Sequence, residues 1–255
     1  MRQPTTSAEP QLRGRTLVIT RPAGTGSRMA SQVRRRGGVA MLLPGLSLRG
    51  MDPRAPVVTA LGAALDDDLL IFTSPAAVRF AARLLPLRTR ATVLAVGQGT
   101  ARALRRHGVE APLAPTGRQD SEGLLDHPVL ADVQGRRVAL IGAPGGRGVL
   151  RAELVTRGAQ LREVHVYQRV APRWQRRQLD AVTQLPAEAR VLLSSAEALE
   201  HLRLGLPAVV YARLSGAVAV VSSERLAEAA RVAGFQRIVV AASALSAELL
   251  AAAAR

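Results

Sequence analysis

The stretch LLIFTSPAAVRFAARL, residues 69–84, decides the fold of this chain. It begins with an apolar run of strand length at 69–72. Thr73, Ser74 and Pro75 then supply the residue types that favour a turn and a helix start. From residue 76 onward the apolar residues recur with the spacing of one helix face. A buried strand that leads through a short turn into an amphipathic helix is half of a βαβ unit.

The same alternation extends along the chain and predicts an α/β fold with parallel sheets flanked by helices. Strands are predicted at 16–20, 69–72, 93–96, 138–141, 191–193, 218–221 and 238–241. Helices are predicted at 28–36, 76–85, 100–107, 149–157, 196–204, 224–233 and 244–254.

An internal repeat divides the chain. Three pairs of segments stand 121 positions apart: Leu17-Val18-Ile19 with Val138-Ala139-Leu140, Gly37 with Gly158, and Thr73-Ser74 with Ser194-Ser195. A shared offset across separated segments indicates duplication. Two copies of a five-stranded α/β unit fit the 255 residues, and the spacing alone predicts tandem domains near 15–120 and 136–255.

Composition excludes several kinds of chemistry. There is no cysteine, which excludes disulfides, thiolate metal sites and cysteine nucleophiles. Lysine is also absent, which excludes Schiff-base chemistry and a P-loop lysine. No apolar stretch reaches the roughly 18 residues that span a bilayer. Residues 1–14 lack the apolar segment of a secretory signal, so we expect a flexible tail there and a cytoplasmic protein.

The net charge of +16 favours an anionic partner. All 35 basic residues are arginine, and the guanidinium group pairs carboxylate and phosphate through two hydrogen bonds. A GC-rich genome explains arginine in place of lysine, but it does not explain the excess over 19 acidic residues. Aromatic residues make up 2% of the chain, so there is no stacking platform for single-stranded nucleic acid.

Most predicted strands end in glycine or a hydroxyl residue just before a helix. In parallel sheets, ligands bind outside the carboxyl ends of the strands, where helix N-termini present free N–H groups to anions. Helix capping explains each turn separately, with Ser194 and Glu197 as a capping box. Their joint position at one edge favours a binding site. The candidates on these turns are Arg21, Thr73, Ser74, Gly97, Thr100, Gly142, Arg147, Ser194, Ser195, Ser222 and Ser223.

The two tyrosines differ in setting. Tyr211 lies on a predicted helix and is interpreted as a packing residue. Tyr167 lies in a predicted linker at 166–172, where its side chain would face a cleft. The four histidines show no HxH or HxxxH pair, so no metal site is expected.

Five segments carry a family resemblance: LVITRP (17–22), IFTSPAAV (71–78), VGQGTARALRRHG (96–108), residues 142–167 ending in RGAQLREVHVY, and VVSSERLAEAARVAGF (220–235). Together they resemble the uroporphyrinogen-III synthase family over nearly the whole chain from residue 15. The resemblance implies two similar α/β domains joined by a two-stranded linker, with the chain crossing twice. It implies one domain of 15–44 plus 173–255, an inserted domain of 52–165, and linker strands at 45–51 and 166–172.

The resemblance also implies a reaction. The family is a lyase of tetrapyrrole (haem) biosynthesis that cyclises hydroxymethylbilane to uroporphyrinogen III, with loss of water and inversion of ring D through a spiro intermediate. No cofactor and no metal are implied, and the family's working unit is usually a monomer. The substrate carries an acetate and a propionate on every ring, which suits a basic protein with free N–H groups.

Site residues follow from matching positions. Tyr167 falls on the family's linker tyrosine, a candidate general acid on the departing hydroxyl. The family's Thr-Ser turn matches Thr73-Ser74, and the hydroxyl pair of the other domain matches Ser194-Ser195. Ser222-Ser223 stands where many members carry a Gly-x-Thr-Thr turn, without that glycine. Candidate carboxylate partners are Arg21, Arg147 and Arg169.

Two other function classes stay open on the sequence. One is a non-catalytic cytoplasmic module that binds a polyanionic small molecule. The other, with less support, is a nucleic-acid-binding protein, which the charge suggests but no helix-turn-helix signal accompanies.

Overall fold

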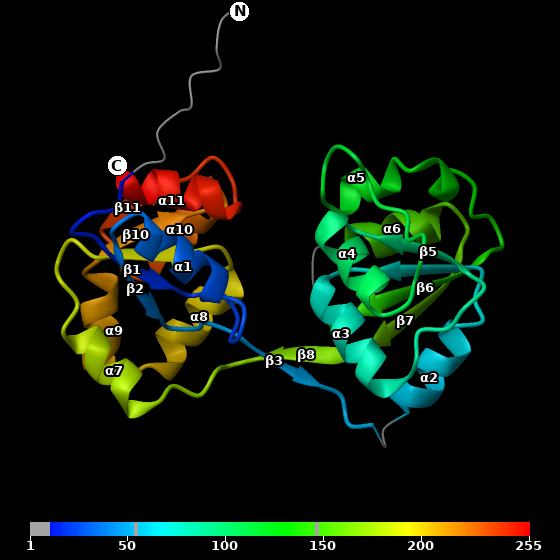
Figure 1. Ribbon diagram of the computed structural model, residues 1–255, viewed down its shortest axis with the longest axis horizontal. Helices are drawn as coiled ribbons and strands as arrows, with labels where there is room; N and C mark the ends of the chain where they lie inside the picture. The colour runs from blue at the N-terminus through cyan, green and yellow to red at the C-terminus, as the bar shows by residue number, and fades with distance from the viewer. Residues whose placement is uncertain (1–10, 54–55, 146–147) are drawn as a thin grey trace, which may run out of the picture. The chain divides into compact units, whose positions relative to one another are not determined.

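The computed structural model describes residues 11–53, 56–145 and 148–255. The chain folds into two compact units (Figure 1). The first unit takes the chain up to Leu48 and again from Val170 to Arg255, and the second comprises Arg49–Arg169. The tandem division expected from the repeat spacing is therefore wrong, because the strand Thr16–Ile19 pairs with the strand Arg190–Leu193 and joins the strand Val39–Leu42 to the same sheet.

The first unit is a five-stranded parallel sheet in the order β11-β10-β9-β1-β2. Its strands are β1 (Thr16–Ile19), β2 (Val39–Leu42), β9 (Arg190–Leu193), β10 (Val218–Val221) and β11 (Arg237–Val240). Its helices are α1 (Ser27–Arg35), α7 (Arg176–Thr183), α8 (Ala196–Gly205), α9 (Ala208–Ser215), α10 (Glu224–Val232) and α11 (Ser246–Ala254).

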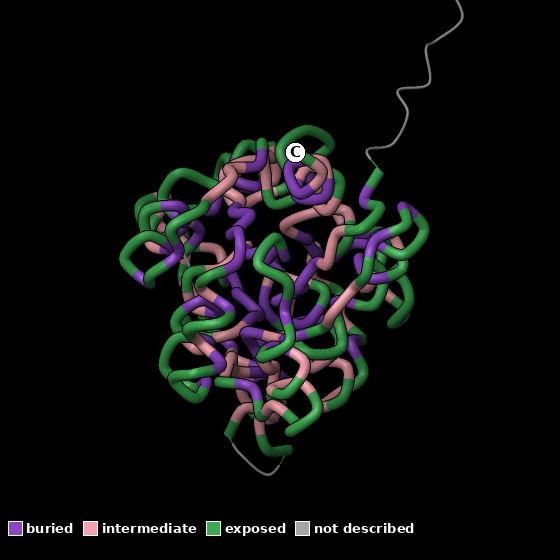
Figure 2. The backbone as a smooth tube through the Cα atoms, turned by 90° about the vertical axis from the view of Figure 1, so that its left-hand side faces the viewer, coloured by how far each residue is buried: buried purple, intermediate pink, exposed green. Residues whose placement is uncertain are grey.

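Both faces of this sheet are covered by helices, which explains its continuous apolar strands. Every residue of β9 and β10 is buried, as expected for parallel strands packed on two sides. Side chains alternate between two cores: Val191 packs on one face, while Leu192 packs on the other beside α1 and α11. Figure 2 shows buried residues in the interior of the backbone trace and exposed residues along its outer turns.

The second unit is a four-stranded parallel sheet in the order β5-β4-β6-β7. Its strands are β4 (Leu69–Phe72), β5 (Thr92–Ala95), β6 (Arg137–Gly142) and β7 (Gln160–His165). Its helices are α2 (Val57–Ala64), α3 (Pro75–Leu84), α4 (Gln98–Arg106), α5 (Ser121–Leu125), α6 (Val149–Thr156) and the short 3₁₀ helix η1 (Pro128–Leu130).

The fifth strand expected in this unit is reduced to one residue. Leu113 makes an isolated parallel bridge to Leu94 at the position where β11 stands in the other sheet. Pro112 and Pro115 flank Leu113 and have no N–H group for a ladder, so pairing cannot extend. The order of the other strands matches between the units, with β4 in the place of β9 and β6 in the place of β1.

Two short strands, β3 (Ser47–Gly50) and β8 (Tyr167–Val170), form a separate two-stranded sheet at the points where the chain passes from one unit to the other. The prediction of an α/β fold with two parallel sheets and this two-stranded connection is confirmed. No helix of the described part of the chain has the length and apolarity that a membrane span requires.

The flexible tail predicted at 1–14 is too long. Leu12 is fully buried in the core under α1 and α11, and its N–H donates to the carbonyl of Arg36 at 2.8 Å. Burial of a leucine and a backbone hydrogen bond fix this segment to the first unit. Residues 1–10 lie outside the described residues.

Candidate functional site

The carboxyl ends of three neighbouring strands in the second unit form the floor of the candidate site. The register pairs Phe72 with Ile141 and Gly142 with His165, so Thr73, Gly142 and His165 follow one another across this edge. The Thr73 hydroxyl donates to the Ile141 carbonyl at 3.2 Å. A Cβ atom at Gly142 would clash with Thr73 Oγ1, so a larger residue at this position would displace the threonine side chain.

A cavity of about 450 Å³ opens at this edge, within the size range of small-molecule sites. The cavity brings together five of the residues that the sequence predicted for the site: Thr73, Ser74, Gly142, Tyr167 and Arg169.

Tyr167 is held from two sides. The residue is 6% exposed, and its ring stacks on Phe80, with 5.2 Å between the ring centroids. Its hydroxyl oxygen lies 3.2 Å from Ser74 Oγ. Ser74 is itself fixed as the N-cap of α3, where its Oγ accepts the N–H of Ala77 at 3.0 Å. The phenol therefore has one defined position on the cavity wall.

Arg169 follows Tyr167 by two residues on β8 and also lines the cavity. Its Nη2 donates to the carbonyl of Pro144 at 2.9 Å, which ties β8 to the loop after β6. Arg147, the predicted carboxylate partner on the same loop, lies outside the described residues.

Two predicted residues of this unit stay outside the cavity. Gly97 is the N-cap of α4, and the N–H of the next residue, Gln98, donates to Gln119 Oε1 at 2.6 Å. Thr100 is 4% exposed within the first turn of α4. The N-terminus of α4 is thus hydrogen-bonded by the protein's own Gln119 side chain. The structure does not bring Gly97 or Thr100 to the cavity lining.

The remaining predicted residues belong to the first unit. Ser195 and Ser223 are the N-caps of α8 and α10, where each Oγ accepts a backbone N–H at 3.3 Å. The capping box predicted for Ser194 and Glu197 is wrong by one residue, because Ser195 is the cap. Ser222 stands directly before the cap of α10. Arg21 donates from Nη2 to the carbonyl of Ala244 at 3.1 Å, and burial lowers the pKa of its guanidinium.

The sequence reasoning missed a group of polar residues on the cavity wall. Glu163 Oε1 lies 2.7 Å from Arg151 Nε, and Glu163 Oε2 lies 3.7 Å from His165 Nε2. All three line the cavity, as does Ser121. Alternate residues of a strand share a face, so the spacing of Glu163 and His165, just before the predicted Tyr167, was the signal that could have found them.

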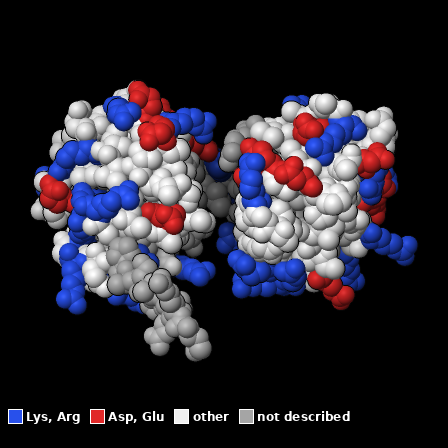
Figure 3. Space-filling model, turned by 90° about the horizontal axis from the view of Figure 1, so that it is seen from above, with Lys and Arg blue, Asp and Glu red and all other residues white. Residues whose placement is uncertain are grey.

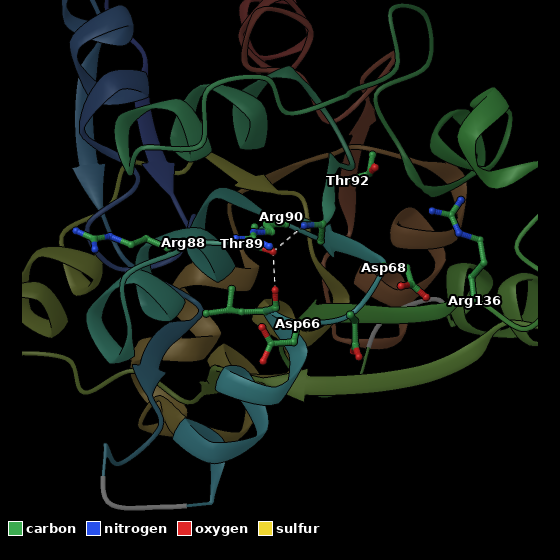
Figure 4. Close-up of a pocket in the computed structure, with 10 residues that line it drawn as sticks. Asp66, Asp68, Arg88, Thr89, Arg90, Thr92 and Arg136 are labelled. Carbon is green, nitrogen blue, oxygen red and sulfur yellow. Dashed lines mark hydrogen bonds between the residues drawn. The ribbon is translucent and has the colours of Figure 1, made fainter.

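A second, larger cavity of about 800 Å³ lies at the amino edge of the same sheet (Figure 4). Its polar groups serve the fold: Asp68 accepts the N–H of Arg137 at 2.9 Å, and the Thr89 hydroxyl donates to the Leu65 carbonyl at 2.6 Å. Figure 4 shows Arg88 extending away from the aspartates, whereas Arg136 stands on the side of Asp68. The groups of this cavity do not converge, so the carboxyl edge is the candidate site.

Asp68 provides a test of the amino edge. The N–H of Arg137, followed by the Arg137 side chain, holds the pKa of the Asp68 carboxyl below its usual value. A depressed pKa stabilises the folded state above the unfolded pKa of about 3.9 and loses this effect as the pH falls through the folded value. Asp68→Asn should therefore unfold at a lower urea concentration than the wild type at pH 7. The difference between the two urea midpoints should become smaller near pH 3. Asp126→Asn, at an exposed position, is the control. An equal difference in urea midpoint between Asp68→Asn and the wild type at both pH values would contradict the predicted coupling of stability to protonation of Asp68.

In the described ranges, no group of three or more His, Asp or Glu side chains is placed to hold a metal ion. The molecule is thus defined as a two-unit α/β protein with a polar small-molecule cavity at the carboxyl edge of one parallel sheet.

Comparison with known proteins identifies the family. The family model described as uroporphyrinogen-III synthase HemD matches residues 27–251. The uroporphyrinogen-III synthase of Escherichia coli K12 is 31% identical over 246 residues, which cover 89% of this chain and 94% of that protein. The chain belongs to the uroporphyrinogen-III synthase family, a family of lyases.

Solved structures show the same fold. A uroporphyrinogen-III synthetase from Helicobacter pylori 26695 superposes with a TM-score of 0.62 at 15% identity, covering 94% of this chain and all of that one. A mutant uroporphyrinogen III synthase from the extremely thermophilic bacterium Thermus thermophilus superposes with a TM-score of 0.56 at 22% identity, covering 92% of this chain and 96% of that one.

Proposed function

We propose that the protein cyclises hydroxymethylbilane to uroporphyrinogen III in haem biosynthesis, with inversion of ring D and loss of water. The observation that carries the proposal is the cavity in which Tyr167, Ser74 and Thr73 meet, in a chain that belongs to the synthase family.

The charge of the protein supports a polycarboxylate substrate. Arginine side chains are spread over the surface, with acidic groups interspersed, on the face shown in Figure 3. A net charge of +16 attracts an anion and raises its rate of encounter. Arg169 on the cavity wall offers a guanidinium to one carboxylate.

Tyr167 is proposed as the general acid on the departing hydroxyl. Ser74 Oγ already accepts the N–H of Ala77, so its own proton is available for the Tyr167 oxygen 3.2 Å away. That arrangement leaves the phenolic proton for the substrate. The Ser74 hydrogen bond would also stabilise the negative charge that develops on the phenolic oxygen as the proton leaves.

The rest of the task is positioning. Hydroxymethylbilane closes spontaneously in water without inversion, which gives the type I isomer. Inversion requires the reactive end to meet the substituted carbon of ring D. We expect fixed hydrogen-bond partners along the strand ends to hold the bilane folded for this attack.

The isomer distribution tests the function. Purified protein, treated with chelator, should convert hydroxymethylbilane mainly to the type III isomer, measured by oxidation to porphyrin and chromatographic separation. Type III should increase with protein concentration, against a background of type I. If type I dominates at every concentration, the synthase assignment fails, and a non-catalytic module for a polyanionic small molecule takes its place.

We further propose that the protein works as a cytoplasmic monomer without a cofactor. Light scattering on the purified chain should give the mass of a single copy, 26.9 kDa. A stable dimer at assay concentration would contradict this part of the proposal.

A further inference from the structure

We propose that His165 is the general base that takes the proton released when the macrocycle closes, and that Glu163 positions it. This inference rests on the proposed synthase function. Tyr167 donates a proton in the proposed reaction, and this inference gives the polar group on the same cavity wall the complementary role of accepting one.

The geometry orients the imidazole. Glu163 and His165 are alternate residues of β7, and Nε2 of His165 faces Glu163 Oε2 at 3.7 Å. The other oxygen of Glu163 lies 2.7 Å from Arg151 Nε on α6, which holds the carboxylate in place. A base whose second nitrogen faces a fixed carboxylate is the arrangement by which enzymes orient histidine.

This orientation leaves Nδ1 of His165 for the substrate. We assign the proton of the neutral imidazole to Nε2, the nitrogen nearer the Glu163 carboxylate, which leaves the lone pair of Nδ1 as the acceptor. The side chain is 41% exposed, on the wall of the cavity that Tyr167 also lines. The Glu163 carboxylate stabilises the imidazolium once the proton has been accepted.

Other groups at this wall are less suited to the task. Of the described residues that line the cavity, Glu163 and His165 carry the carboxylate and the imidazole, and Glu163 is engaged by Arg151. The charged or titratable neighbours on β8 are Tyr167 and Arg169. Helix α2, which also packs on β7, carries no titratable side chain.

With Tyr167 as the acid and His165 as the base, one proton is donated and one is accepted in each turnover. The C–O bond of the substrate breaks, its electron pair leaves with oxygen, and the Tyr167 proton completes the water molecule. Ring D attacks the resulting electrophilic methylene through its substituted α-carbon, which forms the spiro C–C bond. The older bond from that carbon to the methylene of ring C then breaks with its electron pair kept by ring D, and the freed methylene of ring C bonds to the previously free α-carbon of ring D. That carbon loses its hydrogen as a proton to Nδ1 of His165, which restores the pyrrole. Solvent returns a proton to Tyr167 and takes one from His165, and no oxidant or reductant is consumed.

Imidazole rescue tests the proposal. His165→Ala should lower kcat for type III formation about 10²-fold with a small change in KM, since positioned acid–base groups contribute about 10²–10⁴-fold. Added imidazole should restore part of kcat, and the restoration should grow from about pH 6 to about pH 8 as the neutral form of imidazole increases. Glu163→Gln keeps the ring of His165, so its smaller loss of kcat should not respond to imidazole.

The control is His107→Ala, which removes an exposed imidazole at the C-terminus of α4 and should leave kcat unchanged. Circular dichroism checks folding, and His165→Gln replaces the alanine variant if that variant unfolds. A raised KM with unchanged kcat would assign His165 to carboxylate binding and overturn the base role. So would a loss of kcat that imidazole does not restore, or a restoration that falls with pH. Wild-type protein that forms no type III isomer overturns the proposed function itself, a result distinct from any difference between wild type and variants.

Discussion

Tyr167→Phe is expected to lower turnover to type III about 10²-fold, at the lower end of what positioned proton transfer contributes, because the pyrrole already activates the leaving hydroxyl. The phenylalanine ring keeps the stacking on Phe80 and loses only the contact with Ser74 Oγ. The loss of one such hydrogen bond costs about 1 kcal/mol, so the protein should remain folded. Steady-state kinetics with isomer analysis measures the effect, and thermal unfolding measures the stability.

Tyr211→Phe is the matched control for this prediction. The Tyr211 hydroxyl donates to the Ala233 carbonyl at 2.7 Å, and burial raises the pKa of this phenol. Its removal should cost about 1 kcal/mol of stability and leave turnover unchanged, because the residue belongs to the packing of α9 in the first unit. Wild-type turnover in Tyr167→Phe, or equal losses in both variants, would remove Tyr167 from the mechanism.

Gly142→Ala should lower kcat/KM by about 10- to 100-fold, since displacement of a site group by about 1 Å can cost up to about 10²-fold. The added Cβ would clash with Thr73 Oγ1, so the threonine side chain must rotate and give up its bond to the Ile141 carbonyl. The floor of the cavity then changes shape, and the hydroxyl is displaced. Kinetics together with a urea unfolding curve separate the loss of activity from a loss of stability.

Gly62→Ala provides the comparison. This glycine lies within α2, and its Cβ would meet only Leu85 Cδ1 at an ordinary 3.8 Å. Alanine is the better helix former by about 1 kcal/mol, so the variant should be at least as stable as the wild type and fully active. If Gly142→Ala behaves like Gly62→Ala, the close contact between Gly142 and Thr73 does not shape the site.

Much of the fold follows from local pattern. The run at 69–72 followed by Ser74 and Pro75 specifies a buried strand, a cap and a helix start, and the structure places β4, the cap and α3 at these positions. The elements missed by periodicity include the edge strands β2 and β7 of the two parallel sheets. Strand β7, for example, has the burial of an edge strand, with apolar and polar residues mixed, which weakens the apolar signal of 160–165.

Part of the candidate site was also predictable, because its residues stand next to the signals that define the elements. Thr73 and Ser74 are at a strand end, and Gly142 is at the equivalent position of β6. Glu163 and His165 were not predicted, because two polar residues on one strand indicate a solvent-exposed face as long as the strand's neighbours are unknown. Thr100 was predicted for the opposite reason: its local turn resembles a binding turn, but packing buries it in α4.

By itself, the sequence determined the α/β class, the repeat, and which residue types stand at the strand ends, since these depend on the spacing of apolar and turn residues along the chain. Only the tertiary structure decided that β1 pairs with β9, that Gly142 lies against Thr73, and that Arg151, Glu163 and His165 meet on the wall that Tyr167 also lines. Those relations depend on strand order and register. A cross-strand contact is set by the packing of segments far apart in the chain, and local spacing does not specify it.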